Sequence, residues 1–309
     1  MVQQASPAVP TTSVVLGALS HVGQKRSNNQ DSMCSIAAPN TLAGVTALVA
    51  VADGMGGHKG GEVASALAIE GVVGRLGKSS GVNLATGNRS ELIANVVRQI
   101  HADVLAAGNT PETTGMGTTL SIAVIESNRM LVGHVGDSRI YRVRDGQFAQ
   151  LTQDHSWVAD EVRRGNLTEA EAEVHPRRNL LSQAVGVTQT IVPMVAEFDL
   201  SIGDKIMLCS DGLHGLVSNE DMRLTIDNMP PDLAVQTLVD KANEAGGPDN
   251  ITTVIAEIVT SGGTGNSGRT QLSEMNTITL DGRSGFSIFR LLTAPVRLVF
   301  KGLGRLIRR

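Results

Sequence analysis

Five aspartates stand beside the ends of apolar, strand-like runs, in short segments rich in glycine and asparagine. They are Asp31, Asp53, Asp137, Asp211 and Asp249. Each one alone is explained by a turn, because Asp-Gly is a common turn dipeptide. Together they indicate more, because strand ends of one sheet can meet at one edge, where carboxylates repel one another unless a cation neutralises them. Mg²⁺ and Mn²⁺ prefer oxygen ligands, and two such ions about 3.5–4 Å apart hold a hydroxide for attack on phosphorus.

The elements that must position these acids are short strands and helices in mixed order. Strand-like runs cover residues 14–19, 46–52, 120–125, 130–135, 205–209 and 251–258, and helical periodicity covers 61–76, 89–106, 156–164, 219–229 and 231–244. Two hairpins are also expected: residues 126–129 join one pair of strands, and the turn Asp145-Gly146 joins 139–144 to 148–151. Direct hairpins predict antiparallel sheets rather than a doubly wound parallel sheet.

Length and composition exclude several classes of protein. The 309 residues are enough for one large domain or two small ones, and 41% hydrophobic with 18% charged residues is a globular composition. Aromatic residues make up only 2%, which argues against the stacking platforms of nucleic-acid binding. The two cysteines, Cys34 and Cys209, can build neither a disulfide framework nor a thiolate zinc site. With neither a membrane-spanning run nor a signal peptide in the pattern, we expect a cytoplasmic monomer.

The charge is divided between an acidic body and a basic tail. Residues 262–309 carry eight Lys and Arg against two acids, a local charge of +6 in a chain of net charge −4. We expect a disordered N-terminus over 1–12, one domain over 13–260, a flexible Gly-rich linker over 261–285 and a basic amphipathic helix over 286–309. That helix could bind an anionic membrane surface at the inner face of the membrane, bind a partner or dock on the domain. Its basic face carries Arg290, Arg297, Lys301, Arg305 and Arg308.

Six motifs in order carry a family resemblance. They are Arg26 with Asp31, VADGMGGH at 51–58 with GE at 61–62, GMGTT at 115–119, VGDSR at 135–139, CSDG at 209–212 and GPDN at 247–250. The chain closely resembles the bacterial branch of the protein phosphatase 2C (PP2C/PPM) family of metal-dependent protein serine/threonine phosphatases. The resemblance covers residues 13–259. It implies an α+β fold, a four-layer α-β-β-α sandwich of two antiparallel sheets flanked by helices.

The same resemblance implies roles for the acids. Asp53 would bridge two catalytic Mn²⁺ or Mg²⁺ ions, and the Gly54 carbonyl would bind the second. Asp211 and Asp249 would hold the first ion, and Asp31 would act through a metal-bound water. Phosphoserine and phosphothreonine in proteins would be hydrolysed by a metal-bridging water or hydroxide. Such a phosphatase is expected to oppose a bacterial Ser/Thr kinase.

Three further residues receive roles by motif match. Asp137, together with Asp211, corresponds to the third-metal site of bacterial members. Arg26 corresponds to the arginine that clamps the substrate phosphate, for which a planar guanidinium is suited because it bonds in a bidentate way. Asn250 would orient a water or the loop that holds Asp249.

The sequence departs from the animal branch of the family at two positions. Met55 stands where animal members carry a histidine proposed as the leaving-group acid, and Gln30 stands where they carry a metal-binding glutamate. His58 would shape the phosphate entrance or cap the following helix. The leaving-group acid could then be a metal-bound water.

Residues 152–190 match the position of the family's mobile flap. The segment contains a capping box at 168–171 and the arginines Arg163, Arg164, Arg177 and Arg178. These arginines could bind acidic or phosphorylated peptides, or the segment could be a solvated polar lid. Two other functions stay open, a catalytically inactive binding module and a metal phosphodiesterase. The intact acids disfavour the first, and the charged flap and lack of an aromatic pocket disfavour the second.

Overall fold

The structure is a computed structural model that describes residues 12–56, 60–80, 82, 84 and 87–260. The expected linker, the C-terminal helix, His58 and all but one residue of the expected disordered N-terminus lie outside the described residues. Within the described ranges, no helix combines the length and the apolar character needed to cross a bilayer.

Two antiparallel sheets form the middle of the domain. The first has the order β1 (Thr12–His21), β11 (Ile251–Thr260), β10 (Lys205–Cys209), β7 (Arg139–Arg144) and β8 (Gln147–Gln150). The second has the order β2 (Asp31–Ala37), β3 (Val45–Met55), β5 (Leu120–Glu126), β6 (Arg129–Val135) and β9 (Met194–Asp199), and the short β4 (Gly117–Thr118) pairs with the end of β3. Both expected hairpins form, as β5–β6 and β7–β8. Asp145 and Gly146 have φ of 49° and 72°, as a two-residue hairpin turn requires.

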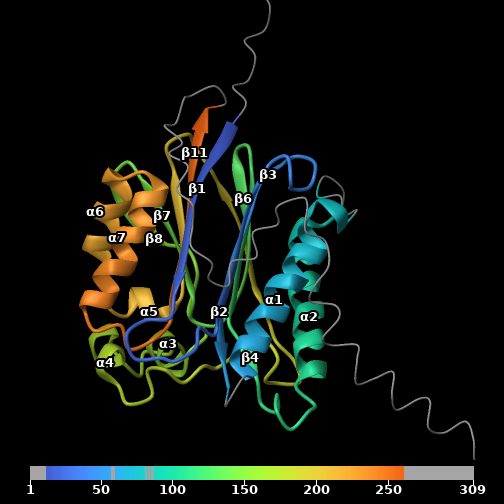
Figure 1. Cartoon of the computed structure of the whole chain (residues 1–309), viewed down its shortest axis with the longest axis vertical. Helices are drawn as coiled ribbons and strands as arrows, with labels where there is room; N and C mark the ends of the chain where they lie inside the picture. Colours follow the sequence, from blue (N-terminus) through green and yellow to red (C-terminus); the bar gives the residue numbers. More distant parts are fainter. Residues whose placement is uncertain (1–11, 57–59, 81, 83, 85–86, 261–309) are drawn as a thin grey trace, which may run out of the picture. The chain divides into compact units, whose positions relative to one another are not determined.

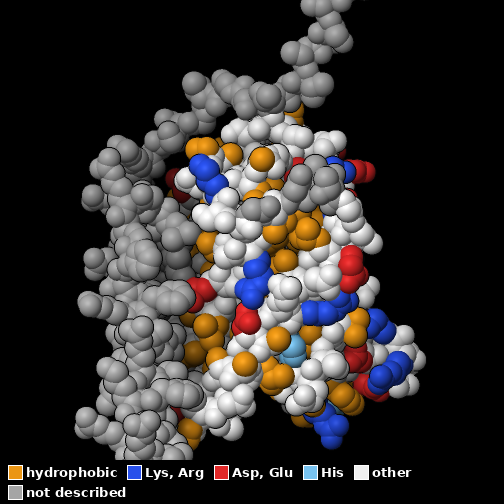
Figure 2. All heavy atoms as spheres, turned by 90° about the vertical axis from the view of Figure 1, so that its right-hand side faces the viewer, with side chains coloured by type: hydrophobic (Ala, Val, Ile, Leu, Met, Phe, Trp, Pro, Cys, Tyr) orange, Lys and Arg blue, Asp and Glu red, His pale blue; other side chains and the backbone are white. Residues whose placement is uncertain are grey.

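Helices cover the outer face of each sheet (Figure 1). α1 (Gly60–Leu76) packs on β2 and β3, and α2 (Arg89–Ala107) packs on β6 and β9. α7 (Pro231–Glu244) packs on β1 and β11, with α6 (Asn219–Asn228) beside it. The short helices are η1 (Lys78–Ser80), α3 (Trp157–Arg163), α4 (Glu169–Val174) and α5 (Asp211–His214). On the side of α1 and α2, basic, acidic and apolar side chains are interspersed over the visible described surface (Figure 2). The expected four-layer α-β-β-α sandwich is therefore confirmed.

The core consists mainly of aliphatic side chains in three layers. Between the sheets pack Val49, Val51, Val132, Ile206 and Val254, all fully buried. Further buried clusters lie between each sheet and its helices. Because both faces of the sheets are covered, central strands such as β3 are continuous apolar runs rather than alternating ones. The rigid sandwich holds the ends of β3, β6 and β10 at fixed positions.

Candidate active site

β2 and β3 place two of the five acids side by side. Asp31 stands opposite Asp53 in the antiparallel register and is buried, with 2% of its surface exposed. Asp31 is the first residue of β2. Its sequence context had suggested only that it follows the first strand. An Asn29 side chain that accepts from the Asp31 N–H at 3.1 Å fixes this strand start.

The other three acids reach the same place from different elements. Asp137 lies between β6 and β7, Asp211 is the first residue of α5, and Asp249 precedes β11. The pKa of Asp53 is raised well above its ordinary value, first by burial and then by repulsion from Asp31, Asp211, Asp137 and Asp249. All five acids named from the sequence therefore form one electrostatic cluster around Asp53.

Burial makes this cluster costly in its fully ionised form. Burial, opposed by hydrogen bonds from Thr252 and Ser210, raises the pKa of Asp31 to about 7. Burial and the nearby Asp211 raise the pKa of Asp137 to about 7. Burial and Asp249 also raise the pKa of Asp211. A bound cation would relieve this repulsion at neutral pH.

Two carboxylate oxygens in the cluster support a cation site. Asp31 Oδ1 and Asp211 Oδ1 are buried and have no hydrogen-bond partner among the described residues. No group of three or more His, Cys, Asp or Glu side chains in the described ranges is already arranged to hold a metal ion by itself. The fit to a divalent cation rests instead on the two unpartnered oxygens and on the all-oxygen donor set, which Mg²⁺ and Mn²⁺ prefer.

The GMGTT motif holds the backbone of Asp53. The Asp53 N–H donates to Thr119 Oγ1 at 2.9 Å, and the Asp53 carbonyl accepts from the Thr119 N–H and Thr118 Oγ1, each at 2.9 Å. Thr119 Oγ1 also lies 2.7 Å from Ser138 Oγ, beside Asp137. The sequence contains both motifs, but from it alone these hydroxyls received no role. The pattern that could have indicated their role is the pair of threonines at the start of an apolar strand.

Gly54 lies where three segments meet. A Cβ at this position would stand 2.1 Å from the Gly61 carbonyl oxygen and 2.4 Å from the Gln30 carbonyl oxygen, so only glycine fits. The Gly54 N–H donates to the Gln30 carbonyl at 3.1 Å, and Ser65 Oγ donates to the same carbonyl at 2.6 Å. The ends of β3, the β1–β2 loop and the start of α1 are thereby locked together.

Asn250 fixes the β1–β2 loop beside Asp249. Its Oδ1 accepts from the Gln30 N–H at 2.8 Å, and its Nδ2 donates to the carbonyls of Val22 and Asn28, each at 2.9 Å. Its own N–H donates to Asp249 Oδ1 at 2.8 Å. The side chain of Asn250 therefore anchors the β1–β2 loop, which is a different loop from the expected one that holds Asp249.

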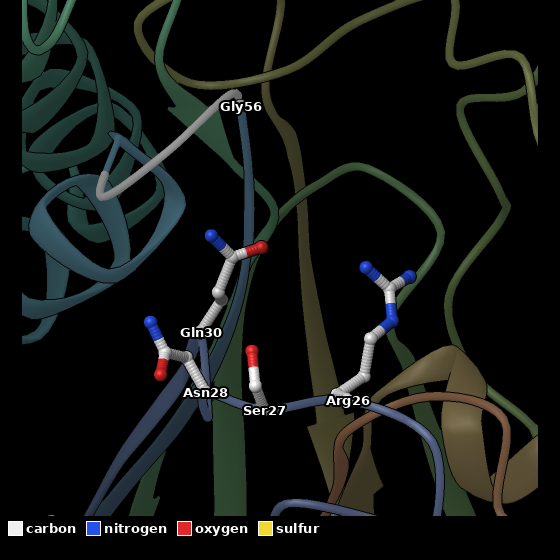
Figure 3. Close-up of a pocket in the computed structure, with 5 residues that line it drawn as sticks. All are labelled: Arg26, Ser27, Asn28, Gln30 and Gly56. Atoms are coloured by element: carbon white, nitrogen blue, oxygen red, sulfur yellow. The ribbon is translucent and has the colours of Figure 1, made fainter.

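Arg26 brings a guanidinium group to the edge of this cluster. Its Nη2 donates to Asp249 Oδ2 at 2.7 Å, and half of its side chain is exposed. Arg26 also lines an open pocket with Ser27, Asn28, Gln30 and Gly56. The side chains of Arg26, Ser27 and Gln30 rise from the loop on the side that faces Gly56 (Figure 3). A guanidinium at the mouth of an acidic site can attract and orient a phosphate.

Near each end of the expected flap, a residue is hydrogen-bonded to a segment that supports the acid cluster. His155 exchanges two hydrogen bonds with Gly136, which precedes Asp137. Val185 exchanges two backbone hydrogen bonds with Thr118. Between these points lie α3, capped by Ser156, and α4, which begins with the expected capping box of Thr168 and Glu171.

Comparison with known proteins decides the family. The sequence profile of the protein phosphatase 2C family matches residues 20–243. The chain belongs to this family. Protein phosphatase PhpP of Streptococcus pneumoniae is 36% identical over 241 residues, which cover 78% of this chain and 96% of PhpP. The expected family and enzyme class, a protein phosphatase, are thereby confirmed.

Two solved structures show the same fold. The serine/threonine phosphatase of S. agalactiae is 33% identical with a TM-score of 0.72, and the match covers 79% of this chain and 99% of that protein. The catalytic domain of the phosphatase PstP, solved in complex with 2 manganese ions, is 33% identical with a TM-score of 0.69, covering 81% of this chain and all of that domain. This phosphatase domain therefore resembles one that binds manganese.

Proposed function

We propose that this phosphatase hydrolyses phosphoserine and phosphothreonine in proteins with the help of two Mn²⁺ or Mg²⁺ ions. The observation that carries the proposal is the buried cluster of carboxylates around Asp53, with Arg26 at its edge. Such a cluster needs cations, and cations beside an arginine suit a phosphate monoester dianion.

Each acid has a proposed place in the metal site. Asp53 would lie between the two ions, and the Gly54 carbonyl would contact the second. Asp211 and Asp249 would hold the first ion, and Asp31 would bind through water. When bound, the ions would lower the pKa of a coordinated water to about 7 and offset the phosphate's charge.

The chain's own residues would position the phosphate and hold the metal-binding carboxylate in place. Arg26 would exchange Asp249 for a phosphate oxygen, since its exposed guanidinium can turn toward either. The hydroxyls of Thr118 and Thr119 would keep the Asp53 backbone fixed while its carboxylate binds. Neither cysteine serves as nucleophile, because burial raises the pKa of Cys34 and of Cys209 to about 12. Met55 has no proton to donate to the leaving group, so a water is the proposed acid.

Removal of metal should abolish turnover. We expect the full-length protein to release phosphate from a phosphothreonine peptide with added Mn²⁺ or Mg²⁺ and to lose this activity in EDTA, because the acids repel without cations. Phosphate release is measured with and without chelator, and a cyclic phosphodiester serves as the second substrate. Full peptide turnover in EDTA contradicts the metal mechanism, and faster turnover of the diester favours a phosphodiesterase.

Asp137 should separate the third ion from the first two. The proposed third ion would be held by Asp137 and Asp211. Because Asp137 has no role at the first two ions, Asp137→Ala should leave those two ions bound and lower turnover of protein substrates. A crystal structure of the variant grown in Mn²⁺ measures the occupancy. Three fully occupied ions in that structure would remove Asp137 from the site.

The physiological partner is proposed to be a bacterial Ser/Thr kinase and its substrates. PhpP and PstP are both phosphatases of bacteria. A phosphoproteome recorded after deletion of the gene tests the proposal, since the substrates of one kinase should gain phosphate together. Scattered changes that share no kinase would contradict it.

The basic tail is proposed to bring the enzyme to an anionic membrane surface. The five cations that the sequence predicts on one face of a helix could each contribute about 1 kcal/mol at such a surface. A protein that ends at Ser261 should keep kcat/KM on a phosphopeptide but lose sedimentation with anionic liposomes, and binding of the full chain should weaken at high salt. Equal sedimentation of both proteins contradicts the membrane proposal, and a large fall in Tm on truncation favours a tail docked on the domain.

A further inference from the structure

The pocket beside Arg26 is lined by further residues whose side chains have no part in the proposed catalytic steps. Besides Arg26 it is lined by Ser27, Asn28, Gln30 and Gly56. Ser27 and Asn28 are exposed, and their side chains form no hydrogen bond to another described residue. Their neighbour Asn29 differs, because its side chain bonds Ser20 Oγ at 2.8 Å and the Asp31 N–H at 3.1 Å. The loop thus uses one polar side chain for its own structure and leaves two toward solvent.

The backbone under these two side chains is held firmly. Asn250 Nδ2 donates to the Asn28 carbonyl and Asn250 Oδ1 accepts from the Gln30 N–H. At the other end of the loop the Gln24 N–H donates to the Gly247 carbonyl at 2.7 Å. A side chain on such a loop loses less freedom when it binds a ligand, since its backbone is already ordered.

The chemistry of the lining narrows the ligand. Among the described residues of the lining, Arg26 is the one that carries a charge, which disfavours a second anion or a cation as the ligand of this part of the pocket. These described residues also include no apolar side chain, which disfavours an aliphatic or aromatic group. The hydroxyl of Ser27 and the amide of Asn28 each both donate and accept hydrogen bonds, as a neutral peptide group does. Gly56, which lies across the pocket from the loop, contributes only backbone to the lining (Figure 3).

We propose that Ser27 and Asn28 bind the peptide groups of the substrate that flank its phosphorylated residue. This inference rests on the proposed function, because it places the phosphate at Arg26. A phosphoserine or phosphothreonine carries its phosphorus only a few bonds from its own Cα, so its neighbouring peptide groups lie beside Arg26. Ser27 and Asn28 are then residues that make the enzyme prefer phosphoproteins over small phosphate monoesters.

The test measures the turnover of a peptide ester and of a non-peptide ester by a double variant and by a control variant. The double variant Ser27→Ala/Asn28→Ala should lower kcat/KM on a phosphothreonine peptide about tenfold, mainly through KM, which corresponds to one or two neutral hydrogen bonds. Turnover of para-nitrophenyl phosphate, which has no peptide group, should stay within about twofold of wild type on the same reasoning. Lys25→Ala is the matched control, because Lys25 is exposed on the same loop but does not line the pocket. It should behave as wild type on both substrates.

Peptides with a single N-methylated amide identify the group that is recognised. Methylation next to the phosphothreonine, on one side or the other, should cost wild type activity and cost the double variant little, whereas remote methylation should cost neither. Equal losses of the double variant on both esters, or equal methylation penalties in both proteins, would overturn the inference. Anisotropy with a non-hydrolysable phosphonate peptide, in Mn²⁺, distinguishes failure of this inference from failure of the proposed function. If wild type binds the phosphonate more tightly than the double variant does but releases no phosphate from the phosphothreonine peptide, the inferred pocket stands and the proposed phosphatase mechanism is wrong.

Discussion

Asp53→Ala is expected to lower kcat on a phosphopeptide by at least about 10³-fold, because this one carboxylate is assigned to both catalytic ions. Asp53→Asn, which keeps the shape of the side chain, should at the same time stabilise the metal-free protein against unfolding. The pKa of Asp53 is raised by burial and by four other carboxylates, so removing its charge relieves repulsion in the folded state.

The stability effect has a definite pH dependence. A carboxyl whose pKa is higher in the folded than in the unfolded protein contributes stability below its ordinary pKa, and that stability is lost as pH rises through the folded value. For Asp31 and Asp137 the loss runs from the ordinary value of 3.8 to about 7. Stability of the metal-free wild type should therefore fall across this window, and the advantage of Asp53→Asn should be larger at pH 8 than at pH 4.

Urea unfolding in EDTA at the two pH values measures this difference. Asp145→Asn is the matched control, since it removes the same charge from an exposed turn where a φ of 49° suits asparagine equally well. It should change neither kcat nor the pH dependence. A folded Asp53→Ala protein with near wild-type kcat would show that the site is assigned wrongly, and an Asp53→Asn protein less stable than wild type at pH 8 would show that the acids do not repel.

The sequence was most informative where one physical requirement acts locally. The helices α1, α2 and α7 begin and end within one residue of the periodic segments that predicted them, because each buries one continuous face. The acids were found because several carboxylates at strand ends need a common explanation. The strand β2 was missed since Ser32 and Ser35 interrupt its apolar run, and Ser32 bonds Ser65 of α1 instead of packing on carbon. The strand β9 was missed because it is an edge strand with the charged Glu197.

What the sequence could not predict are contacts between distant residues. The bonds from Thr118 and Thr119 to Asp53 join positions more than sixty residues apart, and the pair of Arg26 and Asp249 joins positions 223 apart. No local pattern encodes which threonine meets which aspartate, because the sheet register sets it. The resemblance supplied roles for single residues, whereas the folded chain supplies the hydroxyls and the amide of Asn250 that hold them.

Asp249→Ala is the second variant with a large expected effect, a fall in kcat of at least about 10³-fold. Asp249 adds negative charge to a cluster in which it raises the pKa of Asp31, Asp53 and Asp211. Its loss should therefore weaken the attraction of the site for divalent cations, which calorimetric titration with Mn²⁺ measures independently of turnover.

The contact between Asp249 and Arg26 makes the prediction sharper. Arg26→Ala alone should mainly raise KM, since it removes the proposed phosphate clamp. In the Asp249→Ala protein Arg26 has lost its 2.7 Å partner, so the effects of the two substitutions should not add.

Asp103→Ala is the matched control for Asp249→Ala. It breaks an ion pair of similar length and exposure, with Arg75, on the surface of α1 and α2. If Asp103→Ala lowers kcat and Mn²⁺ affinity as much as Asp249→Ala does, the effect is one of net charge and Asp249 holds no metal. A large loss confined to Asp249→Ala places this carboxylate in the site, because surface ion pairs of this kind are worth only about 0–1 kcal/mol to stability.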